Sequence, residues 1–252
     1  MINVTHLGAI ARIELARAPV NALNPALLAA LREALDSAQR DERIAGVCLI
    51  GKPGMFSAGL DVPELLALDR TALKAAWTDF FAIMEGLSRS DKPTVAAITG
   101  HSPAGGAVIA LFCDYRVMAE GPFKIGLNEV QVGLAVPAPI VKAFQRLLGA
   151  HRAERLVVAG SMLDASAALA VGLVDELAAL EAVEAHALQW LQTQLASPPL
   201  AMRATRRNAR TDIADLFNGD TQAQLETLLD GWFGAETQSV MHALVAKLKA
   251  RK

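Results

Sequence analysis

Short runs of branched apolar residues alternate along this chain with segments of helical periodicity. Residues 46 to 51 (GVCLIG) and 93 to 100 (PTVAAITG) have the length and composition of buried strands. Residues 25 to 40 place apolar side chains at helical spacing after an N-capping Asn24, and residues 64 to 90 predict one or two helices. Strands separated by helices in this order predict an α/β domain, with functional loops at the strand ends.

The same alternation continues to about residue 180. Residues 2 to 16 alternate around Gly8, which predicts a hairpin of two short strands, and residues 114 to 120 (DYRVMAE) are strand-like. Further helices are expected at residues 105 to 113, 137 to 148, 151 to 159 and 165 to 171. Only helical patterns follow from about residue 181. We therefore expect a core at residues 1 to 195 and a helical C-terminal region at residues 196 to 252.

The charge balance and apolar content argue against several classes of protein. A formal net charge of -2 lacks the basic excess that nucleic-acid binders need. No stretch approaches the roughly 18 apolar residues of a membrane span, and the first residues lack the pattern of a signal peptide. Cys48 and Cys113 lie in apolar runs, which predicts buried free thiols in a reducing compartment. We expect a cytoplasmic protein without nucleic-acid or membrane partners.

The basic residues and the histidines do not predict a second site. Four arginines fall at helical spacing after two prolines, and we interpret them as a solvated helix face rather than a site for a phosphorylated ligand: Arg203, Arg206, Arg207 and Arg210. The five histidines are scattered without the spacing of metal ligands, so no metal site is predicted.

Two loops of small residues follow predicted strands, at residues 55 to 61 (MFSAGLD) and 100 to 107 (GHSPAGGA). Small side chains let a ligand approach the backbone, and a strand-to-helix turn aims free N–H groups outward. Neither loop matches a P-loop or a dinucleotide fingerprint. Together they could place two N–H donors on one oxygen, as an enolate or a tetrahedral oxyanion needs. Ordinary tight turns are the alternative for each loop taken alone.

A third candidate is Glu129, which stands in a largely apolar segment between Gly126 and Gly133. Desolvation there would raise the pKa of the carboxyl towards a value useful for proton transfer at neutral pH. A surface glutamate on a loop is the alternative.

Taken together, the three loops resemble the crotonase superfamily, also called the enoyl-CoA hydratase/isomerase family. Residues 56 to 61 are similar to its first oxyanion-hole motif, and residues 103 to 106 to its second. The similarity runs from about residue 2 to 180, and residues 102 to 116 and 125 to 129 are especially similar to the 3,2-enoyl-CoA isomerases of the mitochondrial type. The resemblance implies a spiral of β-β-α units, a C-terminal helical region between subunits, and a homotrimer or dimer of trimers.

The resemblance also implies roles for single residues. The N–H groups of Leu60 and Gly105 would form the oxyanion hole, and Glu129 would be the acid/base. The coenzyme A moiety of an acyl-CoA thioester would lie along four residues and its acyl group beside a fifth, in order Ala58, Gly59, Asp61, Val62 and Asn128. Coenzyme A is then part of the substrate, and no separate cofactor or metal is expected.

Val108 distinguishes between reactions of this family, because it stands where its hydratases commonly carry a second glutamate. Adding water needs one group to activate the water and another to manage the proton. Moving a double bond from the 3-position to the 2-position needs only one carboxylate, which takes a proton from the α-carbon and returns it at the γ-carbon. We therefore expect a 3,2-trans-enoyl-CoA isomerase.

Other functions are alternatives to this expectation. A 2-enoyl-CoA hydratase, or another enolate reaction such as decarboxylation, would use a carboxylate at Asp61, Asp114 or Glu120. A non-catalytic acyl-CoA-binding protein is a different class, although such a protein has no need of Glu129. Fatty-acid oxidation is the default pathway. Candidate walls of the acyl pocket are Trp77, Phe80, Val136 and Phe233.

Overall fold

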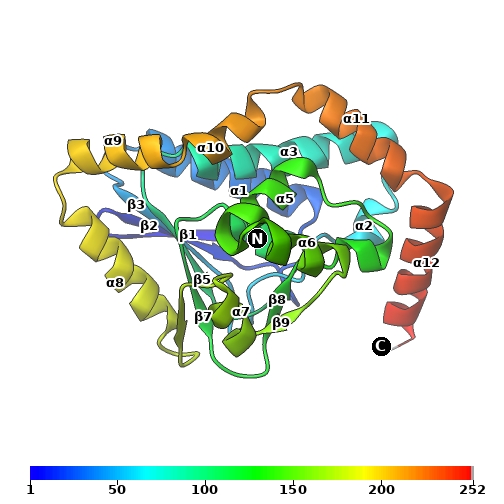
Figure 1. Ribbon diagram of the computed structural model, residues 1–252, viewed down its shortest axis with the longest axis horizontal. Helices are drawn as coiled ribbons and strands as arrows, with labels where there is room; N and C mark the ends of the chain where they lie inside the picture. Colours follow the sequence, from blue (N-terminus) through cyan, green and yellow to red (C-terminus); the bar gives the residue numbers. More distant parts are fainter. Residues whose placement is uncertain (251–252) are drawn as a thin grey trace.

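A six-stranded sheet forms the centre of the computed structural model, which describes residues 1–250 (Figure 1). Its strands, in spatial order, are β1 (Ile2–Leu7), β2 (Ile10–Leu15), β3 (Gly46–Ile50), β5 (Thr94–Ile98), β7 (Tyr115–Ala119) and β10 (Glu176–Ala178). The first pair is antiparallel and every later pair is parallel. Strands β3 and β5 are buried at every residue, because helices pack on both faces of the sheet.

The first helices match the segments predicted from the sequence. Helix α1 (Pro25–Arg40) begins where the Asn24 side chain accepts a hydrogen bond from the Leu27 N–H at 2.9 Å, and it packs on α3 (Arg70–Arg89). The short helix α2 (Val62–Leu65) precedes α3, and α4 (Gly105–Leu111) is buried along its whole length. These helices cover the face of the sheet that holds the larger apolar core.

The opposite face of the sheet is covered by α8 (Val183–Leu195), which contacts β3, β5 and β7. Between β7 and β10 lie α5 (Ala138–Leu148), α6 (Ala150–Val158) and α7 (Ala165–Val171), together with the 3-10 helix η1 (Glu129–Val132). Each of these α-helices agrees with the sequence prediction within one residue at either end. Cys48 and Cys113 are buried free thiols, as predicted.

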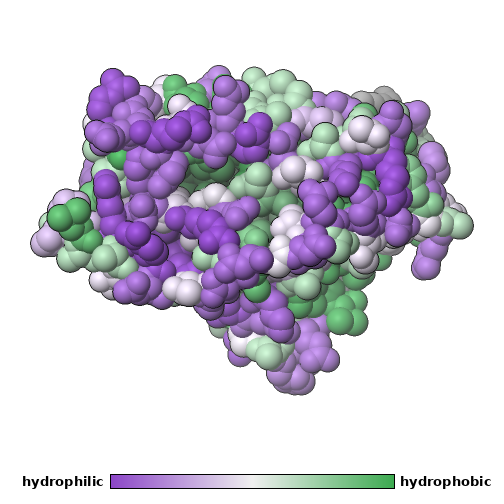
Figure 2. Space-filling view, turned by 90° about the horizontal axis from the view of Figure 1, so that it is seen from above, coloured by the Kyte–Doolittle hydropathy of each residue, from purple (hydrophilic) through white to green (hydrophobic). Residues whose placement is uncertain are grey.

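Helices alone make up the C-terminal part of the chain up to residue 250. They are α9 (Pro199–Ala209), α10 (Thr211–Ala214), the 3-10 helix η2 (Asp215–Phe217), α11 (Thr221–Trp232) and α12 (Ala235–Lys249). Figure 1 shows α9, α10 and α11 running beside α3, with α12 turning down at the far end. Seen from above the view of Figure 1, the surface is mostly hydrophilic with separate apolar patches (Figure 2). No helix within residues 1–250 is long and apolar enough to cross a membrane.

The tail is attached to the core by two arginines of the predicted basic cluster. Arg206 and Arg210 both pair with the carboxylate of Asp114 at 2.9 Å, and their side chains are only 8% and 7% exposed. Arg210 also donates to the Phe112 carbonyl at 2.7 Å. The prediction of a solvated face is therefore wrong for these two residues, because a carboxylate 92 or more positions away in the sequence faces the helix. Arg207 is exposed as predicted.

A second, four-stranded sheet was not predicted. Its strands, in spatial order, are β4 (Gly54–Met55), β6 (Gly100–Pro103), β8 (Lys124–Gly126) and β9 (Leu163–Asp164). The expectation of a loop at residues 100 to 103 is wrong, because β6 pairs in parallel with both β4 and β8. A side chain at Gly100 would lie 2.0 Å from the Gly54 carbonyl carbon, so this pairing requires glycine.

Candidate functional site

The first small-residue loop leaves β4 and leads into α2. Phe56 and Ser57 are fully buried at its start, and the Ser57 hydroxyl donates to the Asn21 carbonyl at 2.7 Å. Gly59 has a φ of 80°, in the left-handed region that favours glycine. The Leu60 N–H follows this turn and donates no hydrogen bond within residues 1–250.

The segment just before α1 is hydrogen-bonded to this loop and holds it in place. The sequence did not predict this contact. The Leu23 N–H donates to the Gly59 carbonyl at 2.8 Å, and the Leu23 carbonyl accepts from the Asp61 N–H at 3.0 Å. The Asn21 amide donates to the Phe56 carbonyl at 3.0 Å. The two flanks of Leu60 are therefore held, while its own N–H is left free. Asn21 has a φ of 51°, and an asparagine two residues after a proline was the only sequence signal for such a turn.

The second loop brings another free N–H beside the first. Ala104 adopts a φ of 45°, a strained conformation for a residue with a side chain, immediately before Gly105 begins α4. The Gly105 N–H has no acceptor in the described part of the chain. A methyl group placed on Gly105 would lie 3.5 Å from the Leu60 nitrogen and 3.4 Å from the Gly59 Cα. The two N–H groups predicted to share one oxygen are therefore neighbours in space.

Close contact between the two loops depends on glycine at a second position. A side chain on Gly106 would lie 2.8 Å from the Ser57 carbonyl oxygen and 2.9 Å from the Ser102 hydroxyl. The two loops are thus packed so tightly that a methyl group on Gly106 would force them to shift.

Glu129 lies at the start of η1, four residues after the middle of β8. Strand β8 pairs with β6, and the Ala104 N–H donates to the Gly126 carbonyl at 2.8 Å. The Glu129 segment and the second loop therefore leave neighbouring strands at the same edge of the sheet. The three predicted loops are therefore linked in the structure through backbone contacts.

Burial makes the carboxyl of Glu129 a weaker acid than an exposed glutamate. The residue is 8% exposed, and desolvation raises the pKa of its carboxyl to about 7, against the smaller opposing effect of a backbone hydrogen bond. Its Oε2 atom is buried without a hydrogen-bond partner in the described residues. A carboxyl of this kind can accept or release a proton close to neutral pH.

The remaining predicted residues have varied surroundings. Asp61 caps α2 through the Glu64 N–H and pairs with Arg17 at 2.8 Å, so its side chain has structural partners. Val62 is 9% exposed within α2. The Asn128 Oδ1 atom is buried and without a hydrogen-bond partner in residues 1–250. That these residues, with Ala58 and Gly59, contact coenzyme A or the acyl group stays a prediction.

Of the three alternative carboxylates, Asp61 and Asp114 have structural ion-pair partners, and Glu120 is exposed. Val108 is fully buried in α4. Asp114 accepts hydrogen bonds from the Thr94 N–H at 2.7 Å and pairs with Arg206 and Arg210, so its oxygens are occupied by structural contacts. Within residues 1–250, no group of three or more potential ligand side chains could hold a metal ion, and the absence of a metal cofactor stays a prediction.

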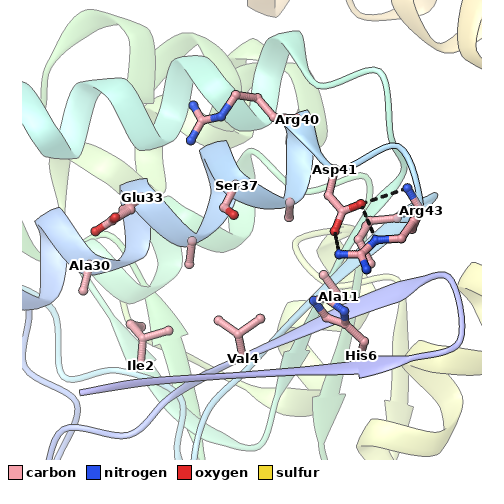
Figure 3. A pocket seen from close by; sticks show the side chains of 13 residues that line it. Ile2, Val4, His6, Ala11, Ala30, Glu33, Ser37, Arg40, Asp41 and Arg43 are labelled. Atoms are coloured by element: carbon pink, nitrogen blue, oxygen red, sulfur yellow. Dashed lines mark hydrogen bonds and ion pairs between the residues drawn. The ribbon is translucent and has the colours of Figure 1, made fainter.

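A separate hollow of about 480 Å³ lies between β1 and α1, and none of the predicted site residues lines it. Figure 3 shows Ile2, Val4 and His6 on the strand facing the helix, with Asp41 and Arg43 paired at one end at 2.7 Å. This hollow has mixed polar and apolar walls and no convergent set of reactive groups.

Comparison with known proteins gives consistent matches along nearly the whole chain. A sequence model described as enoyl-CoA hydratase/isomerase matches residues 5–251. Mitochondrial enoyl-CoA delta isomerase 1 of Mus musculus is 32% identical over 245 residues, covering 96% of this chain and 85% of the relative. A probable enoyl-CoA hydratase, EchA17 of Mycobacterium tuberculosis (strain CDC 1551 / Oshkosh), is 33% identical over 208 residues, covering 82% and 78%.

A solved structure with a similar fold is that of human mitochondrial delta3-delta2-enoyl-CoA isomerase. The two chains superpose with a TM-score of 0.95 at 29% identity, over 100% of this chain and 99% of the human one.

Proposed function

Because this chain belongs to the enoyl-CoA hydratase/isomerase family, we propose that it moves the double bond of a 3-enoyl-CoA to the 2-position. The family resemblance and the crotonase-like fold predicted from the sequence are confirmed by the comparisons. The observation that carries the finer proposal is the buried carboxyl of Glu129, whose pKa is raised to about 7 by desolvation.

The proposed reaction is a proton transfer within the substrate. The Glu129 carboxylate takes a proton from the α-carbon, and the electron pair of that C–H bond delocalises onto the thioester oxygen as a dienolate. Glu129 then returns the same proton to the γ-carbon, and the remaining double bond lies between the α- and β-carbons. The proton and the electron pairs balance without an oxidant, reductant or metal.

The free N–H groups of Leu60 and Gly105 supply the electrostatic part of the proposal. Both would donate to the thioester oxygen, which is more negative in the dienolate than in the ground state, so they stabilise the intermediate preferentially. Removing one such donor typically slows an enzyme about 100- to 1,000-fold.

A single carboxylate favours isomerisation over hydration. Val108, which stands where hydratases of this family commonly carry a second glutamate, is a fully buried apolar residue of α4. A hydratase is the second candidate, because the mycobacterial relatives carry that name.

The two reactions are separated by one absorbance assay at the conjugated enoyl-thioester band. The protein is given 3-hexenoyl-CoA and, separately, 2-hexenoyl-CoA. We expect absorbance to rise with the first and to stay constant with the second. Loss of absorbance with 2-hexenoyl-CoA would mean hydration. No change with either substrate would contradict both the proposed isomerase activity and the alternative hydratase activity.

We further propose that the chain assembles as a homotrimer or dimer of trimers through its helical C-terminal region. Large apolar side chains are exposed on these helices, among them Leu200 at 83%, Phe233 at 41% and Leu248 at 43%. Light scattering coupled to size-exclusion chromatography gives the oligomer mass, and a monomer would contradict the proposal. A cytoplasmic location remains a prediction, since the relatives of mouse, human and rat are named mitochondrial.

A further inference from the structure

The C-terminal helix α12 reaches both halves of the candidate site. It contacts α2, which follows the Leu60 donor, and η1, which carries Glu129. Figure 1 shows α12 at the end of the molecule where α2 lies. The helix therefore lies against the segments that hold the proposed donor and the proposed base, although it contains none of the predicted site residues.

One face of α12 is buried against the rest of the chain. Thr237 is 6% exposed, Met241 is fully buried one turn later, and Leu244 and Val245 continue the same face and pack on the core. Such spacing is typical of a helix that packs along its length on a globular protein. The turn before α12 is fixed as well, because Trp232 is fully buried. The helix is therefore docked on the domain rather than projecting from it.

A series of hydrogen bonds joins the buried face of α12 to Glu129. The Thr237 hydroxyl donates to the Gly133 carbonyl at 2.5 Å. The same peptide group carries the Leu134 N–H, which donates to the Glu129 carbonyl at 3.0 Å. One rigid peptide plane therefore connects the Thr237 side chain with the backbone of Glu129, and hydrogen bonds in series strengthen one another.

Gly133 lets the two backbones come this close. It ends η1 with a φ of 76°, in the left-handed region that favours glycine. A side chain on Gly133 would lie 3.1 Å from the Thr237 Cα, which is closer than nearly all contacts of this kind. The end of η1 thus rests directly on the backbone of α12, and the Thr237 hydroxyl fixes it there.

The proposed reaction needs Glu129 to be held accurately, because one carboxyl exchanges a proton with two different carbons. A misplacement of about 1 Å can slow an enzyme roughly 100-fold. We propose that Thr237 is a positioning residue, whose hydroxyl holds the end of η1 in the place from which the Glu129 carboxyl reaches both carbons. The inference rests on the proposed function and adds to it a residue of the C-terminal helix.

The test compares Thr237→Val, which keeps the size of the side chain and removes its hydroxyl, with Thr237→Ser, which keeps the hydroxyl. With 3-hexenoyl-CoA, we expect kcat of Thr237→Val to fall at least about tenfold and KM to stay within about twofold, because the proton transfer is impaired and coenzyme A binding is not. Thr237→Ser should keep kcat within about threefold of the wild type. Wild-type kcat in Thr237→Val, or an equal loss in both variants, would overturn the inference.

The matched control is Gln238→Met on the same helix. The Gln238 amide donates to the Trp232 carbonyl at 2.8 Å, so this variant also removes one hydrogen bond between a side chain and a carbonyl, away from η1. Its kcat should equal that of the wild type. If kcat fell as far as in Thr237→Val, general loosening of α12 would explain both losses, and the specific role of Thr237 would be refuted.

Amide hydrogen exchange, measured by mass spectrometry, tests the contact without turnover. Loss of one hydrogen bond should speed exchange of the amides of residues 130 to 134 about fivefold in Thr237→Val, and Thr237→Ser and Gln238→Met should match the wild type. An unchanged rate in Thr237→Val would overturn the inference. If the wild type converts no substrate, the proposed function fails, and the exchange rates alone decide whether Thr237 holds η1.

A further variant covers the case in which Thr237→Val does not fold. Thr237→Ala also removes the hydroxyl, and alanine has the higher helix propensity of the two replacements. The same fall in kcat and the same faster exchange are expected of it. Wild-type values of either quantity would overturn the inference.

Discussion

Replacing Glu129 with glutamine is expected to abolish most of the isomerase activity and, at the same time, to stabilise the folded protein at neutral pH. The activity falls because glutamine cannot accept the α-proton, and loss of a general base typically costs about 100- to 10,000-fold in rate. The stability rises because the carboxylate is held in an environment that penalises its charge.

The size of the stability change follows from the pKa. Burial raises the pKa of Glu129 from its ordinary 4.5 to about 7. Between these values the folded state binds more protons than the unfolded state, so the free energy of unfolding falls as the pH rises. Each pH unit contributes about 1.4 kcal/mol, which gives a penalty of about 3 kcal/mol above pH 7 and none below pH 4.5. Glu129→Gln removes this penalty.

Urea unfolding followed by tryptophan fluorescence measures the free energy, at one protomer concentration and at several pH values. We expect Glu129→Gln to exceed the wild type by up to about 3 kcal/mol at pH 8 and to match it near pH 4.5. Glu154→Gln, at an exposed carboxylate of α6, is the matched control and should change neither stability nor rate. A variant that gained nothing at pH 8 would refute the desolvation argument. A variant with near wild-type isomerase rates would refute the assignment of Glu129 as the base.

Three further outcomes are expected. Wild-type kcat/KM should rise about tenfold per pH unit at low pH and level off above about pH 7, where Glu129 is ionised, and a flat profile from pH 5 to 8 would speak against this base. Gly105→Ala adds a methyl group 2.9 Å from the Leu23 side chain and 3.5 Å from the Leu60 nitrogen, which should displace the donor pair and lower kcat about 100-fold or more, whereas Gly86→Ala, in open space on α3, should leave activity intact. Arg210→Ala should cost about 3 kcal/mol in urea unfolding because it breaks a buried ion pair, and the exposed Arg207→Ala should cost little; equal effects would contradict the buried attachment.

Local patterns explain why much of the fold could be predicted. The boundaries of α1 follow from an asparagine cap and an apolar period within sixteen residues, and β3 and β5 follow from short branched runs. The second sheet escaped prediction because its strands are two to four residues long, too short for alternation. Its pairing depends on Gly100 approaching Gly54, which only the folded chain brings together.

The candidate site divides in the same way. The order of small-residue loops and the lone Glu129 are properties of the sequence, and they determined the family and the expected chemistry. Only the tertiary structure decided that Leu60 and Gly105 are neighbours and that Asp114 is taken by arginines from α9 and its C-cap. Each of these contacts joins residues from 45 to 96 positions apart, and no local propensity encodes such a contact.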